Sequence, residues 1–331
     1  MTTNIGIMSF AHLHAESYAI ALNAQLDACL SGIADIAADR AKVMGERYHA
    51  RVFSDYASLL ASDVQGVVIT AENVRHRELV EMAAAAGKHI LCEKPLATTP
   101  DDARKMVAAC DSAGVQLMTA FPCRFSPAMQ RIKKARDNGE LGEVLAVRGT
   151  NRGSCPYGWF TDKSLSGGGA LIDHTVHVTD LLRWLLGREV TEVYAETSNG
   201  MNHQNYEDVV FLTMEFEDGI FATLDSSWSR CKSYPTWGDV TLAVVGDKGV
   251  MNLDMFAQNL IHYSDRSGKT AWKHWGKNID MEMMKAFVHT VKTGEKPPIS
   301  GIDGLRAVEV VQAAYRSVEA GEPIKVEVST I

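Results

Sequence analysis

The stretch His89-Ile90-Leu91-Cys92-Glu93-Lys94-Pro95 joins a short apolar run to a charged end that closes with proline. It follows a helical pattern and a glycine, so the run is typical of a buried strand in a parallel sheet. The proline restricts Lys94 to extended backbone geometry and permits a cis peptide at low cost. A lysine placed there lies at the edge where open α/β sheets collect their ligands.

Further apolar runs surround this one and alternate with alanine-rich helical patterns. We expect strands at residues 5–10, 30–36, 64–70, 90–92 and 115–121, and helices at residues 75–86 and 100–113. Thr99 and Pro100 suit the start of the second helix, and Gly114 suits its end. Such alternation predicts a doubly wound parallel sheet with helices on both faces, as in a Rossmann domain.

The pattern changes after Pro127, where strands begin to dominate. Residues 209–217 alternate between apolar and polar side chains, Asp218-Gly219 predicts a two-residue hairpin turn, and a second reversal is expected at residues 246–249. Helices are expected at residues 127–138, 281–292 and 301–320. We predict two domains, as suits the length: a Rossmann domain over 1–122, and an α/β domain over 123–331 with a large, open-faced, mostly antiparallel sheet.

Composition excludes several classes of protein. Hydrophobic residues make up 46% and charged residues 22% of the 331, which is ordinary for a globular chain, and the formal net charge of −8 argues against nucleic-acid binding. No apolar run approaches the ~20 residues of a membrane span, and no basic stretch precedes the first apolar run. The six cysteines show no Cys-x-x-Cys pair, which suits free thiols in a reducing compartment. We expect a cytoplasmic protein that binds neither nucleic acid nor a membrane.

The loop after the first strand is the candidate dinucleotide site. A glycine-rich fingerprint of the form G-x-G-x-x-G is normally followed, about 20 residues later, by an acid that holds the adenosine ribose. The corresponding loop here is Ser9-Phe10-Ala11-His12-Leu13-His14, and Asp35 follows it by 35 − 14 = 21 positions. Ser9 and Ala11 are small enough for a pyrophosphate to approach, whereas His14 is bulky. An ordinary strand-to-helix turn is the alternative. If the loop does bind a dinucleotide, His12 near the helix amino terminus would donate to a phosphate where a glycine amide otherwise would.

A second candidate site opens with Gly167-Gly168-Gly169, after which a helix carries Asp173, His177 and Asp180. The spacings of four and three place these side chains on one helical face. A carboxylate one turn from an imidazole orients it and raises its basicity, which suits a general base. An Asp–His pair that only caps the helix start is the alternative.

The histidines also raise the question of a metal site. His12, His14, Asp173, His174 and His177 could together supply nitrogen and oxygen ligands. However, a helix points His174 about 100° away from Asp173, and no cysteine pair supports zinc. We therefore predict no metal.

Together the two sites make the chain similar to a known family, the Gfo/Idh/MocA oxidoreductases, named for glucose–fructose oxidoreductase, inositol dehydrogenase and a rhizopine-catabolism protein. The resemblance runs over essentially the whole length. Its markers are residues 67–69 leading to Asn73 and His76, residues 85–96, Arg124-Phe125-Ser126-Pro127, Trp159-Phe160, and the glycine-rich segment ending in Asp173 and His177.

The resemblance implies a Rossmann domain followed by an α/β domain whose open sheet often forms oligomers, so we expect a homodimer or homotetramer. It also implies that Lys94 lies beside the nicotinamide and the substrate hydroxyl, that Asp173 and His177 bind and deprotonate this hydroxyl, and that the Lys94–Pro95 bond is often cis. Three positions depart from the family pattern: the loop without glycines, Glu72 in place of a proline, and Thr175 in place of a glycine.

We therefore predict an NAD-dependent oxidoreductase that transfers hydride between a nicotinamide and a secondary alcohol or ketone of a sugar, cyclitol or related polyol. NAD is favoured over NADP because Asp35 would repel a 2′-phosphate and no arginine follows before Arg40. A relative that retains its cofactor in redox-neutral chemistry, a glycoside-eliminating relative and a non-catalytic NAD-sensing homologue are the alternatives.

The predicted site residues fall into three groups. The catalytic group is Lys94, Asp173 and His177. The cofactor group is Ser9, Phe10, Ala11, His12, Asp35, Thr70, Asn73, His76, Glu93 and Lys94. The substrate group is Arg124, Trp159, Asp173 and His177.

Overall fold

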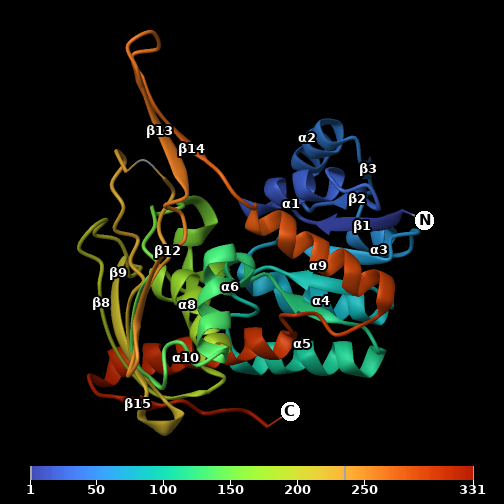
Figure 1. Cartoon of the computed structure of the whole chain (residues 1–331). Helices are drawn as coiled ribbons and strands as arrows, with labels where there is room; N and C mark the ends of the chain where they lie inside the picture. The colour runs from blue at the N-terminus through green and yellow to red at the C-terminus, as the bar shows by residue number, and fades with distance from the viewer. Residues whose placement is uncertain (1, 235, 331) are drawn as a thin grey trace.

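The computed structural model describes residues 2–234 and 236–330, which form two α/β domains that lie side by side (Figure 1). The first contains a parallel sheet in the order β3-β2-β1-β4-β5-β6. Its strands are β1 (Thr3–Met8), β2 (Ala28–Ala34), β3 (Arg51–Val52), β4 (Gly66–Ile69), β5 (His89–Cys92) and β6 (Leu117–Thr119). This order confirms the predicted Rossmann topology, in which ligands bind where the strand order reverses, here between β1 and β4.

Helices cover both faces of this sheet because successive strand residues point to opposite sides. Ile7 of β1 and Val68 of β4 pack with α1 in one apolar cluster, whereas Met8 and Val67 pack with the helices of the other face in a second. The helices are α1 (His14–Asn23), α2 (Ala38–Tyr48), α3 (Tyr56–Leu60), α4 (His76–Ala85) and α5 (Pro100–Ala113), with the short turn η1 (Asn73–Arg75) before α4.

Helix α5 has the bounds that the sequence predicts. The Thr99 side chain accepts a hydrogen bond from the Asp102 amide, and Gly114 ends the helix at φ 67°. Strand β3 was not predicted, because two residues are too few to show a periodic pattern.

The second domain contains a seven-stranded sheet in the order β12-β11-β7-β10-β9-β8-β15, in which only β7 and β10 run parallel. The predicted, mostly antiparallel sheet is thus confirmed. Its strands are β7 (Val144–Thr150), β8 (Val190–Ser198), β9 (Val209–Phe216), β10 (Phe221–Asp225), β11 (Thr241–Gly246), β12 (Val250–Asp254) and β15 (Ile324–Lys325).

One face of this sheet is covered by α8 (Ala170–Leu186) and α10 (Gly301–Ala320), as Figure 1 shows. Strand β9 alternates as predicted, with Leu212 and Met214 buried and Phe211 on the other face 56% exposed. The other helices are α6 (Pro127–Asp137), α7 (Lys163–Ser166) and α9 (Ile279–Thr293), and the short turns are η2 (Pro122–Phe125), η3 (Gly158–Thr161) and η4 (Glu217–Gly219).

The two predicted reversals differ in outcome. Gly246 and Gly249 close a two-residue turn, as expected, through the bond from the Gly246 amide to the Gly249 carbonyl. The predicted two-residue turn at Asp218-Gly219 is wrong, because the Phe216 amide pairs with the Ile220 carbonyl and leaves three residues in the loop. Asp218 and Gly219 both have left-handed backbone conformations there, at φ 64° and 78°, and a loop of three residues accommodates them.

Helix α9 returns from the second domain to cover the first sheet. Gly66 of β4 lies so close to it that a Cβ there would be 2.7 Å from Val291 and 3.2 Å from Phe287. Ser17 of α1 also donates to Asp280 at 2.8 Å. The predicted boundary at residue 122 stays a prediction, and α9 joins the two domains across it.

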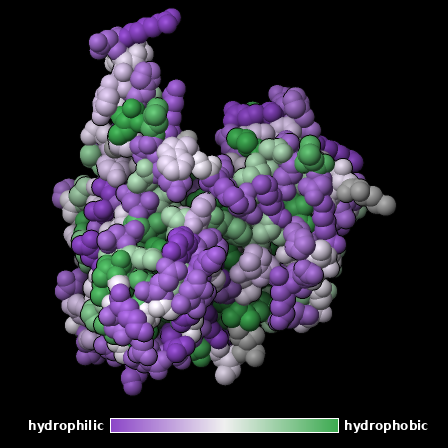
Figure 2. Space-filling model, viewed as in Figure 1, coloured by the Kyte–Doolittle hydropathy of each residue, from purple (hydrophilic) through white to green (hydrophobic). Residues whose placement is uncertain are grey.

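The hairpin β13 (Asn259–Ser264) and β14 (Lys269–His274) projects from the body of the molecule (Figure 1) and has a hydrophilic tip (Figure 2). The sequence did not predict it. All six cysteines are free, as expected. Among the described residues, no helix combines the length and apolarity needed to cross a membrane.

Candidate active site

A cavity of about 370 Å³ lies between the two domains. Both domains contribute side chains to it, which come from the loop before α1, from Lys94 shortly after β5, from the first turns of α8, and from the loop before β11. The polar side chains that line it are His12, His14, Lys94, Asn151, Asp173, His174, His177, Thr236, Asp239 and Asp280. The predicted catalytic group therefore faces one cavity.

Lys94 and Asp173 form the centre of this cavity. Lys94 follows β5, and its Nζ donates to Asp173 Oδ1 at 2.5 Å and to the Asp173 carbonyl oxygen at 3.3 Å. Asp173 Oδ2 accepts from Trp228 Nε1 at 3.0 Å and lies 3.3 Å from His174 Nε2. Both charged side chains are almost fully buried, so this ion pair has little screening from water. The Lys94–Pro95 peptide bond is cis.

Burial would by itself raise the pKa of Asp173, but the charge of Lys94 and the neighbouring His174 instead hold this pKa well below its usual range. Asp173 is therefore a carboxylate at neutral pH. Its position depends on a glycine: a Cβ on Gly169 would lie 2.2 Å from the Glu207 carbonyl oxygen, while the Gly169 amide donates to Glu207 Oε1 at 2.6 Å. Glu207 thus fixes the start of α8.

His177 lies one turn further along α8 and also lines the cavity. Burial lowers the pKa of His177 well below 6.5, and Lys94 and His174 lower it further, so the imidazole is neutral. The predicted pair of the Asp173 and His177 side chains does not form: both Asp173 carboxylate oxygens are taken by Lys94, Trp228 and His174, and no hydrogen bond among the described residues reaches the His177 imidazole. Instead, Phe121 packs edge-on against the imidazole at 6.0 Å.

Arg124 lies away from the cavity, contrary to the predicted substrate contact. Its guanidinium donates to both oxygens of Asp180, at 2.8 and 2.5 Å, and to Asp303 at 2.9 Å. Asp180, predicted to share the face of Asp173, is fully buried in this network. Since these donors are bound by two carboxylates that connect α8 and α10, Arg124 stabilises the helix packing.

Trp159, which was predicted to contact the substrate, also lies outside the lining of the cavity. Its Nε1 donates to the Ala11 carbonyl oxygen at 2.9 Å, and its ring stacks on Phe160 at 3.9 Å. Phe160 lines the cavity, whereas Trp159 is not part of the lining. Trp159 therefore connects the second domain to the loop that precedes α1.

Sequence reasoning missed several residues that line the cavity or hold its side chains. Trp228, which holds Asp173, and Trp237 in the lining were indistinguishable in sequence from core tryptophans. His174 was predicted to point away from Asp173, yet it contacts that carboxylate and lines the cavity. Cys123 also lines it, and burial raises the pKa of its thiol to about 12, so it is not a thiolate nucleophile at neutral pH.

The loop from Ser9 to His14 has the backbone that the fingerprint requires, although it lacks glycine. Ser9 occupies the first fingerprint position at φ 77°, a left-handed conformation that normally favours glycine. Its Oγ accepts from the Ala11 amide at 3.2 Å, which stabilises the turn. The Leu13 amide, at the start of α1, takes part in no hydrogen bond among the described residues. That free donor and the helix dipole suit a phosphate group.

Asp35 lies after β2, beside this loop. It accepts from the amides of Phe10 at 2.7 Å and Ala37 at 2.8 Å, and it pairs with both Nε and Nη2 of Arg40 at 2.7 Å. Burial opposes ionisation, but the hydrogen bonds from Arg40 and the two amides lower the pKa of Asp35. The sequence did not foresee that Arg40 covers the carboxylate.

The other predicted cofactor residues support neighbouring turns. Thr70 Oγ1 donates to the Ser9 carbonyl oxygen at 2.7 Å, and Asn73 Nδ2 donates to the Ser166 carbonyl oxygen at 2.8 Å. The Asn73 Oδ1 atom is buried without a partner among the described residues. His76 lies between the carbonyl oxygens of Ala71 and Pro95, at 3.2 and 3.0 Å, and holds the turn after β5.

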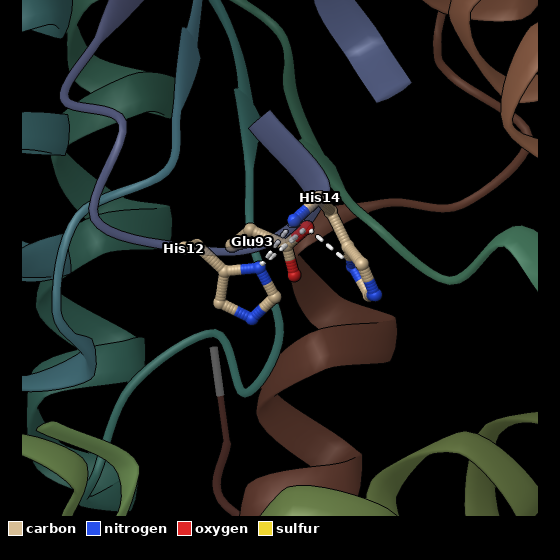
Figure 3. A group of neighbouring side chains, drawn as sticks. All are labelled: His12, His14 and Glu93. Carbon is tan, nitrogen blue, oxygen red and sulfur yellow. Dashed lines mark hydrogen bonds and ion pairs between the residues drawn. The ribbon is translucent and has the colours of Figure 1, made fainter. Parts of the chain in front are cut away.

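Glu93 is buried next to Lys94 and directed towards the loop histidines (Figure 3). Its Oε1 lies 3.0 Å from His14 Nδ1 and accepts from Tyr18 at 2.5 Å, and its Oε2 accepts from the Lys94 amide at 2.9 Å. His12 Nδ1 accepts from the His14 amide at 3.2 Å, and His12 Nε2 is buried without a partner among the described residues, so the predicted bond from His12 to a phosphate stays a prediction. Burial lowers the pKa of His12 to about 3 and outweighs the attraction of Glu93.

Comparison with known proteins agrees with these features. Residues 4–121 match the oxidoreductase family with an NAD-binding Rossmann fold, and residues 129–252 match the Gfo/Idh/MocA C-terminal domain. The chain belongs to the Gfo/Idh/MocA oxidoreductase family. It is therefore an enzyme of oxidation and reduction with an NAD-binding Rossmann domain, as the sequence predicted.

Members of the family with similar sequences include an uncharacterized oxidoreductase, YrbE, from Bacillus subtilis, 30% identical over 90% of this chain and 89% of that protein. A myo-inositol 2-dehydrogenase from Thermotoga maritima is 29% identical over 98% of this chain and 97% of that protein. Among solved structures, GenD2 from gentamicin A biosynthesis, in complex with NAD, has a TM-score of 0.90 at 26% identity and covers 98% of this chain and 97% of its own.

Proposed function

We propose that this enzyme oxidises a secondary alcohol of a sugar, cyclitol or related polyol with NAD, and reduces the corresponding ketone in reverse. The observation that carries the proposal is the convergence of Lys94, Asp173 and His177 on one cavity between a Rossmann domain and a second domain. Support for the substrate class comes from the myo-inositol 2-dehydrogenase similarity and from the many hydrogen-bonding groups of the lining.

His177 is the group that we assign as general base. It is neutral at pH 7 because burial lowers its pKa, and its Nδ1 is buried, which leaves Nε2 available to a ligand. This nitrogen would take the hydroxyl proton as the carbonyl forms. A bound nicotinamide dinucleotide would supply the acceptor for the hydride that leaves the same carbon.

Lys94 is assigned to the substrate oxygen. Its ammonium is held by Asp173, and its donors stabilise negative charge that develops on the oxygen when the proton leaves. Because a buried carboxylate already fixes the lysine, little reorganisation is needed during the reaction. Asp173 thus positions Lys94, whereas the sequence predicted that it would orient His177.

For the cofactor, we propose NAD over NADP. Asp35 stays negatively charged at the end of β2 and would repel a 2′-phosphate, and the two hydrogen bonds to Asp35 occupy the Arg40 guanidinium. The residues at the switch point fit a dinucleotide, since the loop is left-handed at Ser9 and the Leu13 amide has no hydrogen-bond partner within the part of the chain that the structure describes.

Replacing Asp35 with alanine should release Arg40 and shift the preference towards NADP. We expect the ratio of kcat/KM for NAD to that for NADP to fall by about tenfold or more, which corresponds to about 1.4 kcal/mol. Steady-state kinetics with both cofactors measures this ratio. Asp63→Ala, an exchange of another acid of the same domain that lies far from Arg40 in sequence, serves as the control. An unchanged ratio in Asp35→Ala would show that Asp35 does not select the cofactor.

A panel of sugars and inositols assayed for NADH formation tests the proposed reaction, and calorimetry with NAD and NADP tests cofactor binding. NADH formation with at least one polyol is the expected result. Protein that is purified with tightly bound cofactor and yields no net NADH would instead favour redox-neutral chemistry. No binding of either cofactor would favour a non-catalytic homologue.

We also propose that the protein acts in the cytoplasm and assembles as a homodimer or homotetramer through the open face of the second sheet. The free cysteines support the first point. The exposed Phe211 and Phe221 on the outer sheet face support the second. Light scattering of the purified protein measures the oligomeric state.

A further inference from the structure

Three side chains beside the proposed active site form a cluster that hydride transfer does not require. His12 and His14 lie in the loop between β1 and α1, and Glu93 follows β5 (Figure 3). Glu93 Oε1 is 3.0 Å from His14 Nδ1 and 3.7 Å from His12 Nδ1. One nitrogen or oxygen ligand atom from each residue lies within 4.8 Å of the other two.

The hydrogen bonds in the cluster place two acceptor atoms close together. His12 Nδ1 accepts from the His14 amide, so this nitrogen carries no proton, and the carboxylate oxygen of Glu93 lies 3.7 Å from it. Two acceptors in this arrangement repel each other unless a cation or a proton lies between them. Lys94 does not supply the cation, because Asp173 holds its ammonium group.

The burial of Glu93 and His12 strengthens the need for a cation or proton beside the carboxylate. Glu93 is fully buried and His12 is 3% exposed, and His12 Nε2 has no partner among the described residues. A buried carboxylate is stable only when it is paired or coordinates a metal. The protonated form of His14 is one possible partner, and a metal ion bound by all three side chains is the other.

The geometry and chemistry of the cluster suit the metal. Ligand atoms about 2.0–2.2 Å from a tetrahedral zinc ion lie about 3.3 Å from each other, close to the two distances between Glu93 and the histidines. Two imidazoles and one carboxylate are also a donor set of catalytic zinc sites, which leave a position open. Tyr18 and the Lys94 amide orient the carboxylate, as partners of metal ligands commonly do.

We propose that His12, His14 and Glu93 bind one divalent transition-metal ion, with Zn²⁺ as the preferred ion, at the edge of the active-site cavity. His12 and His14 line this cavity, so the open coordination position faces the space in which a substrate oxygen would bind. The ion displaces the proton between His14 and Glu93, and it replaces the hydrogen bond from the His14 amide to His12 Nδ1. The inference does not depend on the proposed dehydrogenation, because metal binding needs no substrate or cofactor.

Metal content of the full-length, tag-free protein tests the proposal. The protein is stripped with a chelator, dialysed against Zn²⁺ and analysed by mass spectrometry for zinc per chain, and Co²⁺ is added in parallel to record its visible absorption. We expect one zinc ion per chain and the absorption of low-coordinate cobalt. The variants His14→Ala and Tyr18→Phe should weaken binding, by about 10- to 100-fold for Tyr18→Phe and by more for His14→Ala.

The matched control is His289→Ala, which removes an exposed histidine that also faces a glutamate, at 3.1 Å. It should keep full zinc content. His14 is partly exposed, so its alanine variant is expected to fold, and circular dichroism checks this point. Substoichiometric zinc in the wild type, or binding that His14→Ala leaves unchanged, would overturn the proposal and leave a His14–Glu93 ion pair as the explanation.

Discussion

Replacing Lys94 with alanine is expected to lower kcat by about 10²- to 10³-fold, the usual loss when one donor to a developing oxyanion is removed. The ammonium of Lys94 is buried at 2.5 Å from Asp173, so water cannot readily take its place. KM should change less than kcat, because the interaction strengthens as charge develops on the substrate oxygen. Steady-state kinetics with the substrate found in the polyol panel measures both constants.

The same substitution has a cost in stability that must be separated from catalysis. It leaves Asp173 buried without its cation, and breaking a buried pair in this way costs about 3–5 kcal/mol. The unfolding temperature of each variant is therefore measured together with its kinetics. The variant Lys94→Arg is included because it keeps the positive charge but changes the shape of the side chain. Lys88→Ala is the control, because Lys88 lies before β5 and donates to the carbonyls of Ser62 and Val64 at the opposite end of the strand. A folded Lys94→Ala enzyme with wild-type kcat would refute the assigned role.

Replacing His177 with alanine is expected to lower kcat by about 10²- to 10⁴-fold, the range for loss of a general base. In the wild type, burial lowers the pKa of His177 well below 6.5, and the neutral form is the active one. Activity should therefore persist below pH 6.5 and fall only as the pH passes down through this lowered pKa. The variant should lose that acidic limb of the kcat/KM profile.

Two comparisons make the His177 result interpretable. His262→Ala, on the projecting hairpin, exchanges an exposed histidine and should leave both the rate and the pH profile unchanged. Unfolding temperature should change little in His177→Ala, since no hydrogen bond among the described residues reaches this side chain. An acidic limb that persists in the variant would assign it to another group.

The first domain could be predicted almost entirely from sequence, because its order follows from local patterns. Alternating apolar runs and alanine-rich helices indicate parallel strands, and the Thr99–Pro100 start and Gly114 end mark α5 within one residue. The second sheet was also predicted, from the alternation in β9. The β13–β14 hairpin was missed, because its residues are exposed on both faces and show no core-directed period.

The site was harder to predict, because partners far apart in sequence compete for each polar group. The spacing of Asp173 and His177 suggested a pair, but Lys94, 79 residues away, binds the carboxylate more strongly. Arg124 and Trp159 belong to motifs that predicted a substrate contact. In the structure, Arg124 donates instead to Asp180, and Trp159 donates to the Ala11 carbonyl oxygen. The cluster of His12, His14 and Glu93 forms only when β1 and β5 lie in one sheet, so the loop histidines alone did not indicate it.

The most direct test of the account is the double variant Lys94→Ala/His177→Ala, compared with the two single variants. If both side chains act on one hydroxyl in one step, their effects are not additive, because each needs the other in the transition state. We predict that kcat of the double variant is at most about tenfold lower than kcat of the less active single variant. A double variant whose loss equals the product of the two single losses would show that Lys94 and His177 act independently, and would contradict the proposed site.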